Sequence, residues 1–456
     1  MKHNIILNSD SYKYSMFNQY PEGTETVYSY IESRGGKWPS TVFFGLQAFI
    51  KEYLLEPITQ EDIDIAEQII TAHGEPFYRE GWEYILNAHN GFLPVNIKAV
   101  PEGTIVPVKN VLATIENTDP KCFWLTTFLE TALLRAIWYP TSVATNSYES
   151  KKIILKWLEK NGDDNDIDFK LHDFGARGVS SLESSALGGA AHLVNFCGTD
   201  NVASLVLLTR WYGVGCAGFS VPAMEHSTVT SWGRDREVES YRNMIRKNPN
   251  GVVSIVSDSY NIYQACEMFG TVLKQDIIDN NVQLVVRPDS GVPAIIVSEC
   301  LFMLDRYFGH TVNDKGYKVL NTVRVLQGDG ITGESIDLIL KYADSRGYSA
   351  DNILFGQGGA LLQQLDRDTQ KWAMKCSAIK VNGTWREVFK DPITDPGKTS
   401  KKGRVTLYKR EDGTYYSGLE DWPLSELKVV FENGKLFNEI TFDQVRENAR
   451  LTQTTF

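Results

Sequence analysis

Two different patterns of apolar and polar residues divide the chain. Up to about residue 140, apolar residues recur at helical spacing in some segments, such as 46–55, and form extended runs in others, such as 105–115. This mixture predicts an α+β domain over residues 1–140. The C-terminal segment, residues 391–456, again contains short extended runs and turns, and we expect it to pack back on this domain.

From about residue 170 onward, short apolar runs alternate with helical patterns, which is typical of β-α units. Seven such units predict an α/β fold, an irregular and closed or nearly closed TIM-like (β/α) barrel over residues 141–390. In such a barrel the active site lies at the carboxyl ends of the strands, where polar residues gather in this sequence. The runs end at His172-Asp173-Phe174-Gly175, Gly198-Thr199-Asp200, Ser220-Val221-Pro222, Ser257-Asp258-Ser259, Arg287-Pro288-Asp289-Ser290-Gly291, Gly328-Asp329-Gly330 and Gly356-Gln357-Gly358-Gly359.

Composition restricts the partners of this chain. With 456 residues, of which 42% are hydrophobic, it can bury the core of one large and one smaller domain. The formal net charge of -11 argues against bulk nucleic-acid binding, so any phosphate site must be local. Residues 1–10 hold only a short apolar run, and no later run has the length needed to span a bilayer. We therefore expect no membrane partner and a cytoplasmic location.

The six cysteines are far apart in the sequence, without a C-x-x-C pair or a nearby histidine at metal-ligand spacing. A disulfide framework would be unusual in so large a chain. We expect reduced and mostly buried thiols at Cys122, Cys197, Cys216, Cys266, Cys300 and Cys376.

Glycine-rich loops late in the barrel are candidates for phosphate binding. Gly358 and Gly359 stand just ahead of a helical pattern, where backbone N–H groups could hold a phosphate. An ordinary glycine turn fits these residues equally well. The glycines on either side of Asp329 strengthen the phosphate interpretation. The cationic run 398–404 could add contacts to phosphate, although charge alone favours a solvated loop.

Three carboxylates stand at successive strand ends: Asp258, Asp289 and Asp329. Their mutual repulsion favours a bridging divalent cation or the hydroxyls of a sugar, although each aspartate alone could also cap a helix. Arg287 precedes Asp289 by two residues, and a bare ion pair is the alternative there.

Two further places in the sequence hold side chains that could take part in catalysis or ligand binding. His226 follows a strand end and could serve as acid, base or phosphoryl acceptor, or be structural. Phe174 and Arg177 offer a ring and a fork of donors that could grip a planar amide or carboxylate. Packing is the alternative role of the ring.

Several longer segments carry a more specific signal than any single motif, among them Asp10-Ser-Tyr-Lys13, Ile97-Lys-Ala-Val-Pro-Glu-Gly103, Lys170-Leu-His-Asp-Phe-Gly175, Val256-Ser-Asp-Ser-Tyr260, Arg287-Pro-Asp-Ser-Gly291 and Lys390-Asp-Pro392. Through these segments the chain resembles the nicotinamide phosphoribosyltransferase family over nearly its whole length. The resemblance implies an irregular α/β barrel beside an α+β domain, and an active site at the interface of a homodimer. It implies the reaction of nicotinamide with phosphoribosyl pyrophosphate to nicotinamide mononucleotide and pyrophosphate, with Mg²⁺ and with ATP as an activating co-substrate.

The same resemblance assigns the residues that bind nicotinamide. The pyridine ring would stack between Phe174 and Tyr12 of the partner subunit, with Asp200 and Arg177 at the carboxamide. A carboxylate accepts from an amide NH₂ and repels a substrate carboxylate, so Asp200 favours nicotinamide over nicotinic acid. The resemblance also places Asp10 and Ser220 among the residues that bind substrate.

It also assigns the residues around the sugar donor. Asp258 would help place the metal and pyrophosphate, Asp289 and Asp329 would hold ribose hydroxyls, and Arg287 would lie beside nicotinamide and the sugar. His226 matches the family's phosphorylated histidine, through which ATP hydrolysis is coupled to product formation. The residues implied at phosphate groups are Arg34, Gly328, Gly358, Gly359, Arg367, Lys390 and Lys398.

One departure and two alternatives accompany the resemblance. The family's run of three glycines before the helix reads Gly358-Gly359-Ala360 in this chain. A nicotinic acid phosphoribosyltransferase would share the barrel but prefer the acid substrate. A catalytically silent relative would keep the fold as a binding protein.

Overall fold

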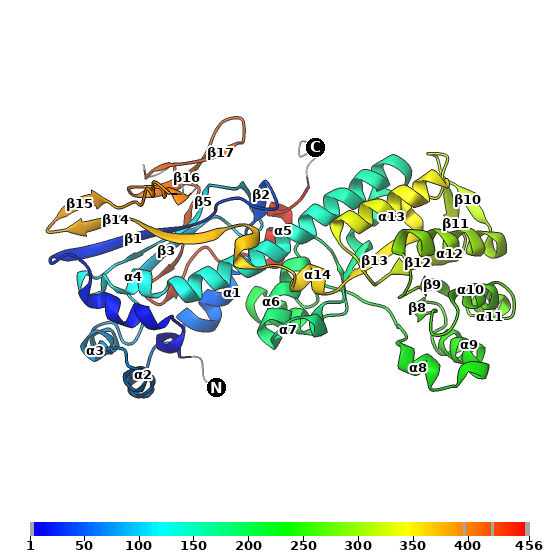
Figure 1. Ribbon diagram of the computed structural model, residues 1–456, viewed down its shortest axis with the longest axis horizontal. Coiled ribbons are helices and arrows are strands. Elements are labelled where there is room, and N and C mark those ends of the chain that lie inside the picture. Colours follow the sequence, from blue (N-terminus) through cyan, green and yellow to red (C-terminus); the bar gives the residue numbers. More distant parts are fainter. Residues whose placement is uncertain (1–3, 395–397, 421–423, 452–456) are drawn as a thin grey trace. The chain divides into compact units, whose positions relative to one another are not determined.

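The computed structural model describes residues 4–394, 398–420 and 424–451, and the chain forms two compact units (Figure 1). Unit 1 comprises Met1–Thr145, Thr209–Val214 and Asp366–Arg450. Unit 2 comprises Asn146–Leu208, Gly215–Leu365 and Leu451–Phe456. The chain first passes from unit 1 to unit 2 within helix α5 (Glu130–Asn161).

Unit 1 is built on a seven-stranded sheet in the order β15-β14-β1-β5-β3-β18-β19. β1 pairs antiparallel with both β14 and β5, and β3 pairs with β18, so the two ends of the chain contribute neighbouring strands. The strands of this sheet are β1 (Thr24–Ser33), β3 (Val95–Ala99), β5 (Val111–Asn117), β14 (Trp372–Val381), β15 (Thr384–Glu387), β18 (Lys428–Glu432) and β19 (Lys435–Leu436). Two smaller pairs are β2 (Ser40–Val42) with β4 (Ile105–Pro107), and β16 (Val405–Lys409) with β17 (Tyr415–Leu419).

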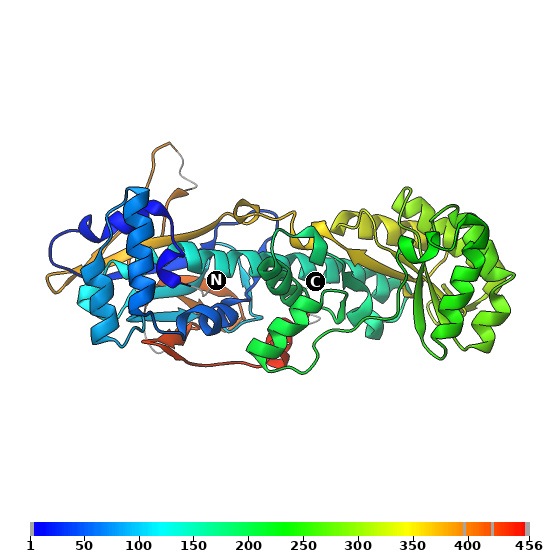
Figure 2. The ribbon, with the colours of Figure 1, turned by 90° about the horizontal axis from the view of Figure 1, so that it is seen from below.

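Helices cover one face of this sheet. Figures 1 and 2 show α2 and α3 on the same side of it, and Trp82 of α3 is buried in the core, where its ring packs edge-on against Phe128 of α4. Helix α2 begins at a capping box between Thr59 and Asp62 and ends at Gly74, whose φ of 97° suits glycine. The helices are α1 (Leu46–Phe49), α2 (Gln60–His73), α3 (Arg79–Ala88), α4 (Leu125–Phe128) and α15 (Phe442–Asn448).

Strand β14 corrects the predicted domain boundary. Sequence patterns assigned residues 141–390 to the barrel, but residues 366–390 belong to unit 1, because β14 pairs with β1 from Thr24–Val381 to Ser33–Trp372. β14 is buried at most positions on both faces. A central antiparallel strand of this kind has the same continuous apolar run as a barrel strand, so its sequence pattern does not distinguish the two environments.

Unit 2 is built on a six-stranded sheet in the order β7-β6-β13-β12-β9-β8, in which every neighbouring pair is parallel. Two isolated parallel bridges, Gly198 to Phe219 and Ala223 to Ser254, connect the edge strands β7 and β8 through residues 219–223. The predicted irregular α/β barrel is therefore confirmed, with one of the seven segments held by single bridges instead of a ladder. The strands are β6 (Leu171–Asp173), β7 (Gly198–Thr199), β8 (Val252–Val256), β9 (Gln283–Arg287), β12 (Val323–Gln327) and β13 (Ile353–Gln357).

Helices follow the strands and pack on them. Val253, Leu284, Val325 and Phe355 are fully buried in the core that these helices close, and α12 packs against β12 and α13. The helices are α6 (Leu182–His192), α7 (Val202–Tyr212), α8 (His226–Thr230), α9 (Glu237–Lys247), α10 (Ile262–Gly270), α11 (Lys274–Asp279), α12 (Pro293–Phe308), α13 (Gly333–Ser345) and α14 (Gly359–Leu362). A hairpin of β10 (His310–Val312) and β11 (Lys318–Leu320) lies between α12 and β12 in the chain.

The helices and the cysteines bear on the expected absence of membrane spans and of disulfides. No helix among the described residues combines the length and the apolar character that crossing a membrane requires. All six cysteines are unpaired, and three of them are buried, namely Cys122, Cys266 and Cys300.

Candidate active site

The ring of Phe174 lies against the ends of two neighbouring strands of unit 2. A methyl carbon added to Gly356, in β13, would lie 2.1 Å from the ring atom Cε2. One added to Gly328, just after β12, would lie 3.5 Å from the same ring atom and 3.2 Å from Asp289 Oδ1. The predicted ring-binding residue and a predicted sugar-binding carboxylate therefore meet at Gly328, and glycine at 356 leaves room for the ring.

A hollow of about 610 Å³ opens beside the ends of β6 and β7. Its lining includes Arg177, from the loop after β6, and Asp200, from the loop after β7. Ser220 Oγ donates to Asp200 Oδ1 over 2.6 Å. The carboxylate of Asp200 thus has one oxygen engaged by a hydroxyl while its residue lines an open space, where it can accept a hydrogen bond from a ligand.

Arg287 stands among the carboxylates of the site. It is partly buried and donates to the main-chain carbonyl of Met224. Burial lowers the pKa of Arg287, while the nearby charges of Asp289, Asp200 and Asp258 act in the opposite direction. Since an arginine side chain stays protonated in proteins, the site holds a fixed positive charge close to three acids.

His226 and Asp258 form a pair at the ends of adjacent segments. His226 Nε2 lies 3.1 Å from Asp258 Oδ1, and Ser290 Oγ donates to the other carboxylate oxygen. The side chain of Asp258 is 6% exposed, whereas that of His226 is 48% exposed. The buried acid is held from both sides and orients an imidazole that solvent and ligands can reach.

The candidate phosphate loops are neighbours. Gln327 of β12 pairs with Phe355 of β13, so the glycines that follow these strands lie at the same edge of the sheet. A methyl carbon added to Gly359 would have no atom within 4 Å, which leaves the start of α14 open. Ala360 lies within α14 and its φ is not positive, so a methyl group in place of the family's third glycine causes no backbone strain.

Six of the predicted residues belong to unit 1, and their contribution to this strand-end site stays a prediction. Tyr12 is 58% exposed, as ring stacking against a second subunit requires. Asp10 accepts a hydrogen bond from Thr131 over 2.6 Å, and the main chain of Lys390 is bonded to Ser400. The six are Asp10, Tyr12, Arg34, Arg367, Lys390 and Lys398.

Sequence patterns placed two further residues at strand ends without assigning them a role in the site. Asp173 is a fully buried acid at the end of β6, and Gly356 makes room for Phe174. A polar residue closing an apolar strand was a detectable signal for Asp173, whereas the other contacts appear only once the chain is folded.

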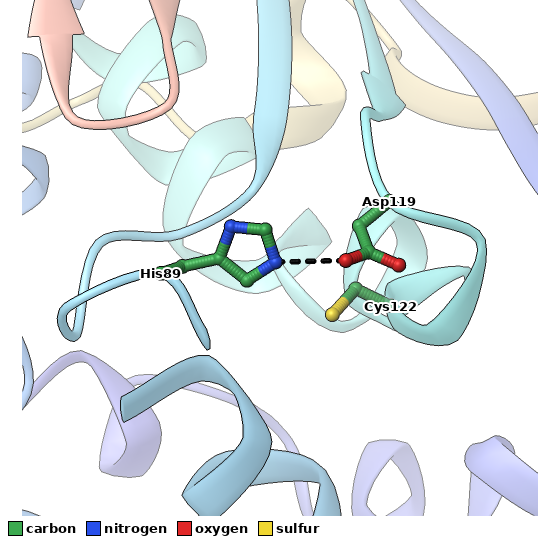
Figure 3. Close-up of side chains that lie close together, drawn as sticks. All are labelled: His89, Asp119 and Cys122. Atoms are coloured by element: carbon green, nitrogen blue, oxygen red, sulfur yellow. Dashed lines mark hydrogen bonds and ion pairs between the residues drawn. The ribbon is translucent and has the colours of Figure 1, made fainter. Parts of the chain in front are cut away.

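A separate cluster in unit 1 contains potential metal ligands (Figure 3). The ligand atoms of His89, Asp119 and Cys122 lie within 4.8 Å of one another, a grouping that sequence spacing does not show. Asp119 Oδ2 already accepts from His89 and from Tyr84, and Oδ1 accepts from the main chain of Lys121. Burial raises the pKa of Cys122 to about 12, which disfavours the thiolate that metals bind. Hydrogen bonding accounts for this cluster, and we assign it no ion.

Comparisons with known proteins cover nearly the whole chain. Residues 169–435 match the nicotinate phosphoribosyltransferase (NAPRTase) family, and residues 4–97 match the N-terminal domain of nicotinamide phosphoribosyltransferase. The nicotinamide phosphoribosyltransferase of Xanthomonas campestris pv. campestris is 53% identical over 98% of both chains. That of Acinetobacter baylyi is 34% identical, over 97% of this chain and 96% of its own.

Two solved structures share the fold. The nicotinate-nucleotide pyrophosphorylase of Pyrococcus furiosus superposes with a TM-score of 0.63 at 17% identity, covering 98% of this chain and 95% of its own. Human nicotinic acid phosphoribosyltransferase gives a TM-score of 0.59 at 16% identity, covering 97% and 92%. At these identities the likeness concerns the architecture and not the substrate.

Proposed function

The chain belongs to the nicotinamide phosphoribosyltransferase family, a family of pentosyltransferases, and on that premise we propose that it makes nicotinamide mononucleotide and pyrophosphate from nicotinamide and phosphoribosyl pyrophosphate, in NAD salvage. The observation that carries the proposal is that Asp200 and Arg177 line one hollow. Phe174, three residues before Arg177, has its ring against Gly356 and against Gly328, which lies next to Asp289.

Nicotinamide fits the chemistry of these residues. Its flat ring can stack on Phe174, its carboxamide NH₂ can donate to Asp200, and its carboxamide oxygen can accept from Arg177. A substrate carboxylate in the same place would face the negative charge of Asp200. Differential affinity of this kind is what separates an amide from an acid of equal shape.

Transfer at C1′ of the ribose needs positioning more than a strong base. Departure of pyrophosphate leaves an oxocarbenium-like centre, so fixed negative charge beside the sugar and a held pyridine nitrogen both lower the barrier. Asp289 and Asp329 would hold the ribose hydroxyls, and Arg287 would lie between the ring and the sugar. The glycine loops at 328 and 358–359 would receive the 5′-phosphate, with Arg34, Arg367, Lys390 and Lys398 adding positive charge.

The residues present fit Mg²⁺ held through the pyrophosphate. Carboxylate oxygen is the ligand that Mg²⁺ prefers, and Asp258 presents one next to His226. Among the described residues, the one group of three potential ligand atoms is His89, Asp119 and Cys122, so the strand-end acids form no cage of their own. Substrate oxygens would complete the coordination, and the bound ion would neutralise charge on the leaving group.

A cytoplasmic homodimer that shares this site is part of the proposal. Leu182 and Val202, which line the hollow, are 78% and 68% exposed, and Phe219 and Val221 beside Ser220 are 52% and 37% exposed. Exposed apolar groups concentrated at one site mark surfaces that bind a partner. A second subunit covering them would bring Tyr12 of the partner subunit to the ring site.

Turnover of the purified protein tests the function as a whole. We expect nicotinamide mononucleotide to form from nicotinamide, phosphoribosyl pyrophosphate and Mg²⁺, with nicotinic acid a poor substrate. A clear preference for the acid would favour a nicotinic acid phosphoribosyltransferase. No product from either substrate, with ATP also present, would favour a silent binding protein.

Changing Asp200 to asparagine is expected to reduce the preference for nicotinamide over nicotinic acid by about 10- to 100-fold, the range of one charge-assisted contact. Asparagine keeps an oxygen that can accept from the substrate amide and from Ser220, so the substitution removes mainly the charge. The ratio of kcat/KM for the two substrates measures the effect. An unchanged ratio in a folded variant would contradict the role of the charge.

Changing His226 to alanine is expected to abolish the gain in product formation that ATP provides, while transfer without ATP persists. A phosphohistidine at this position would add negative charge and acceptor oxygens beside Asp258. Rates with and without ATP give the measurement. His310→Ala is the matched control, because His310 also pairs with an aspartate, Asp305, but lies on the β10–β11 hairpin. Equal ATP stimulation in wild type and His226→Ala would rule out the phosphohistidine.

A further inference from the structure

A buried acid and a buried amide lie directly behind the residues assigned to nicotinamide. Asp173, the last residue of β6, and Asn201, which follows Asp200, are 0% and 1% exposed. Asp173 Oδ1 accepts from the main-chain N–H of Gly175 over 2.7 Å, and Oδ2 accepts from Asn201 Nδ2 over 2.9 Å. The main-chain N–H of Asp200 donates to the carbonyl of Asp173 over 3.0 Å. One residue therefore holds the chain on both sides of Phe174 and at Asp200.

Asn201 extends these contacts to helix α6. Its Nδ2 also donates to the carbonyl of Ser185 over 2.8 Å, and its Oδ1 accepts from Ser185 Oγ over 3.1 Å. A methyl carbon added to Gly189 would lie 2.5 Å from Nδ2, so the helix packs closely on the amide. Both ends of the amide are engaged, and a fully satisfied buried network of this kind specifies one arrangement of the loops it joins.

The negative charge of Asp173 also acts on Asp200. Burial raises the pKa of Asp173 to about 6, and the nearby carboxylate of Asp200 acts in the same direction. Because Asp173 is fully buried, solvent screens its charge less than it screens a charge at the surface. Negative charge behind Asp200 adds to the repulsion that a substrate carboxylate meets.

We propose that Asp173 and Asn201 form a positioning pair that holds Phe174 and Asp200 in register and so strengthens the choice of the amide substrate over the acid. The inference deepens the proposed function and rests on it. Asp200 and Phe174 contact the substrate, whereas the pair acts through them. Nicotinamide binding depends on the pair, and binding of the phosphoribosyl donor does not.

Three variants test the pair: D173N, N201D and the double variant D173N/N201D. In D173N the new side chain has only one oxygen for the two hydrogen bonds that the carboxylate of Asp173 accepts, and its NH₂ competes with a donor. In N201D two carboxylates face each other and repel. The double variant restores a hydrogen bond between an amide and a carboxylate with the two groups exchanged, but it loses the bond that Asn201 donates to the carbonyl of Ser185. D305N is the matched control, because Asp305 is another well-bonded acid of unit 2, held by His310, Lys318 and Tyr348.

The readouts are KM for nicotinamide, KM for phosphoribosyl pyrophosphate, and the ratio of kcat/KM for nicotinamide and nicotinic acid. We expect D173N to raise KM for nicotinamide and to lower the ratio, each about tenfold, as the loss of one charged hydrogen bond implies, with KM for the donor unmoved. The double variant is expected to recover part of the loss in KM, because only the bond between residues 173 and 201 is restored. D305N is expected to lower the melting temperature only.

Each other outcome overturns the inference. An unmoved ratio in folded D173N, or equal increases in both KM values, would show a merely structural acid. If D173N does not fold, N201S removes the amide that bridges to the acid and supplies the same measurements. Wild-type protein that forms no product from either substrate would overturn the proposed function and this inference together, whereas active wild type with an unmoved D173N ratio overturns the inference alone.

Discussion

A Gly356→Ala variant is expected to lose about 30- to 100-fold in kcat/KM for nicotinamide, through a higher KM. The added methyl carbon would lie 2.1 Å from Cε2, 2.2 Å from Cδ2 and 2.9 Å from Cζ of Phe174, far inside van der Waals contact. The ring must therefore leave its position. Overpacking costs about 1–3 kcal/mol, and a displaced ring also loses its stacking on the substrate. Steady-state kinetics with nicotinamide as the varied substrate measure the effect.

Gly251→Ala is the matched control for this prediction. Gly251 precedes β8 in the same unit, its φ is not positive, and a methyl carbon there would have no atom within 4 Å. We expect wild-type kinetics from it. A Gly356→Ala enzyme with unaltered KM for nicotinamide would show that the position of Phe174 does not matter for binding.

An Asp289→Ala variant is expected to lower kcat by about 100-fold, more than His226→Ala does. Hydrogen bonds from a charged group contribute about 1.5–3 kcal/mol, and this carboxylate lies beside Gly328 at the proposed sugar site. Arg287 would also lose the largest of the charges that oppose the effect of burial on its pKa. Rates at saturating nicotinamide and phosphoribosyl pyrophosphate measure kcat.

Asp279→Ala controls for the loss of an acid from unit 2, because Asp279 is an exposed residue at the end of α11 that accepts a hydrogen bond from Gln275, four residues earlier. A wild-type kcat in Asp289→Ala would remove this residue from the reaction. A change confined to KM for the phosphoribosyl donor would limit Asp289 to ground-state binding.

The seven strand ends of unit 2 were predictable because each combines two local signals. An apolar run identifies a strand, and the polar or glycine-rich cluster after it identifies the edge where side chains become accessible. All seven clusters lie at the ends of strands or on the bridged segment 219–223. The predicted domain boundary at residue 390 was wrong because β14 is buried on both faces, and such a strand has the same apolar pattern in either sheet.

The residues that contact substrate in the proposal were easier to predict than those that hold them. Phe174, Asp200 and Asp289 stand in recognisable strand-end clusters. The close fit of Gly356 under Phe174 joins segments far apart in the sequence, and no local pattern reports it. The same holds for the bond between Asp173 and Asn201, whose residue types alone are common in loops.

The order of strands in unit 1 has a consequence for synthesis on the ribosome. β1, β3 and β5 emerge early and can form a three-stranded antiparallel sheet with β5 in the middle, but its outer neighbours β14 and β18 begin only at Trp372 and Lys428. Until then both edges of this three-stranded sheet carry unpaired N–H and C=O groups, which favour association with other chains. The strands of unit 2 all lie between Leu171 and Gln357. The barrel can therefore close before β14 and β18, which complete the sheet of unit 1, have been synthesised.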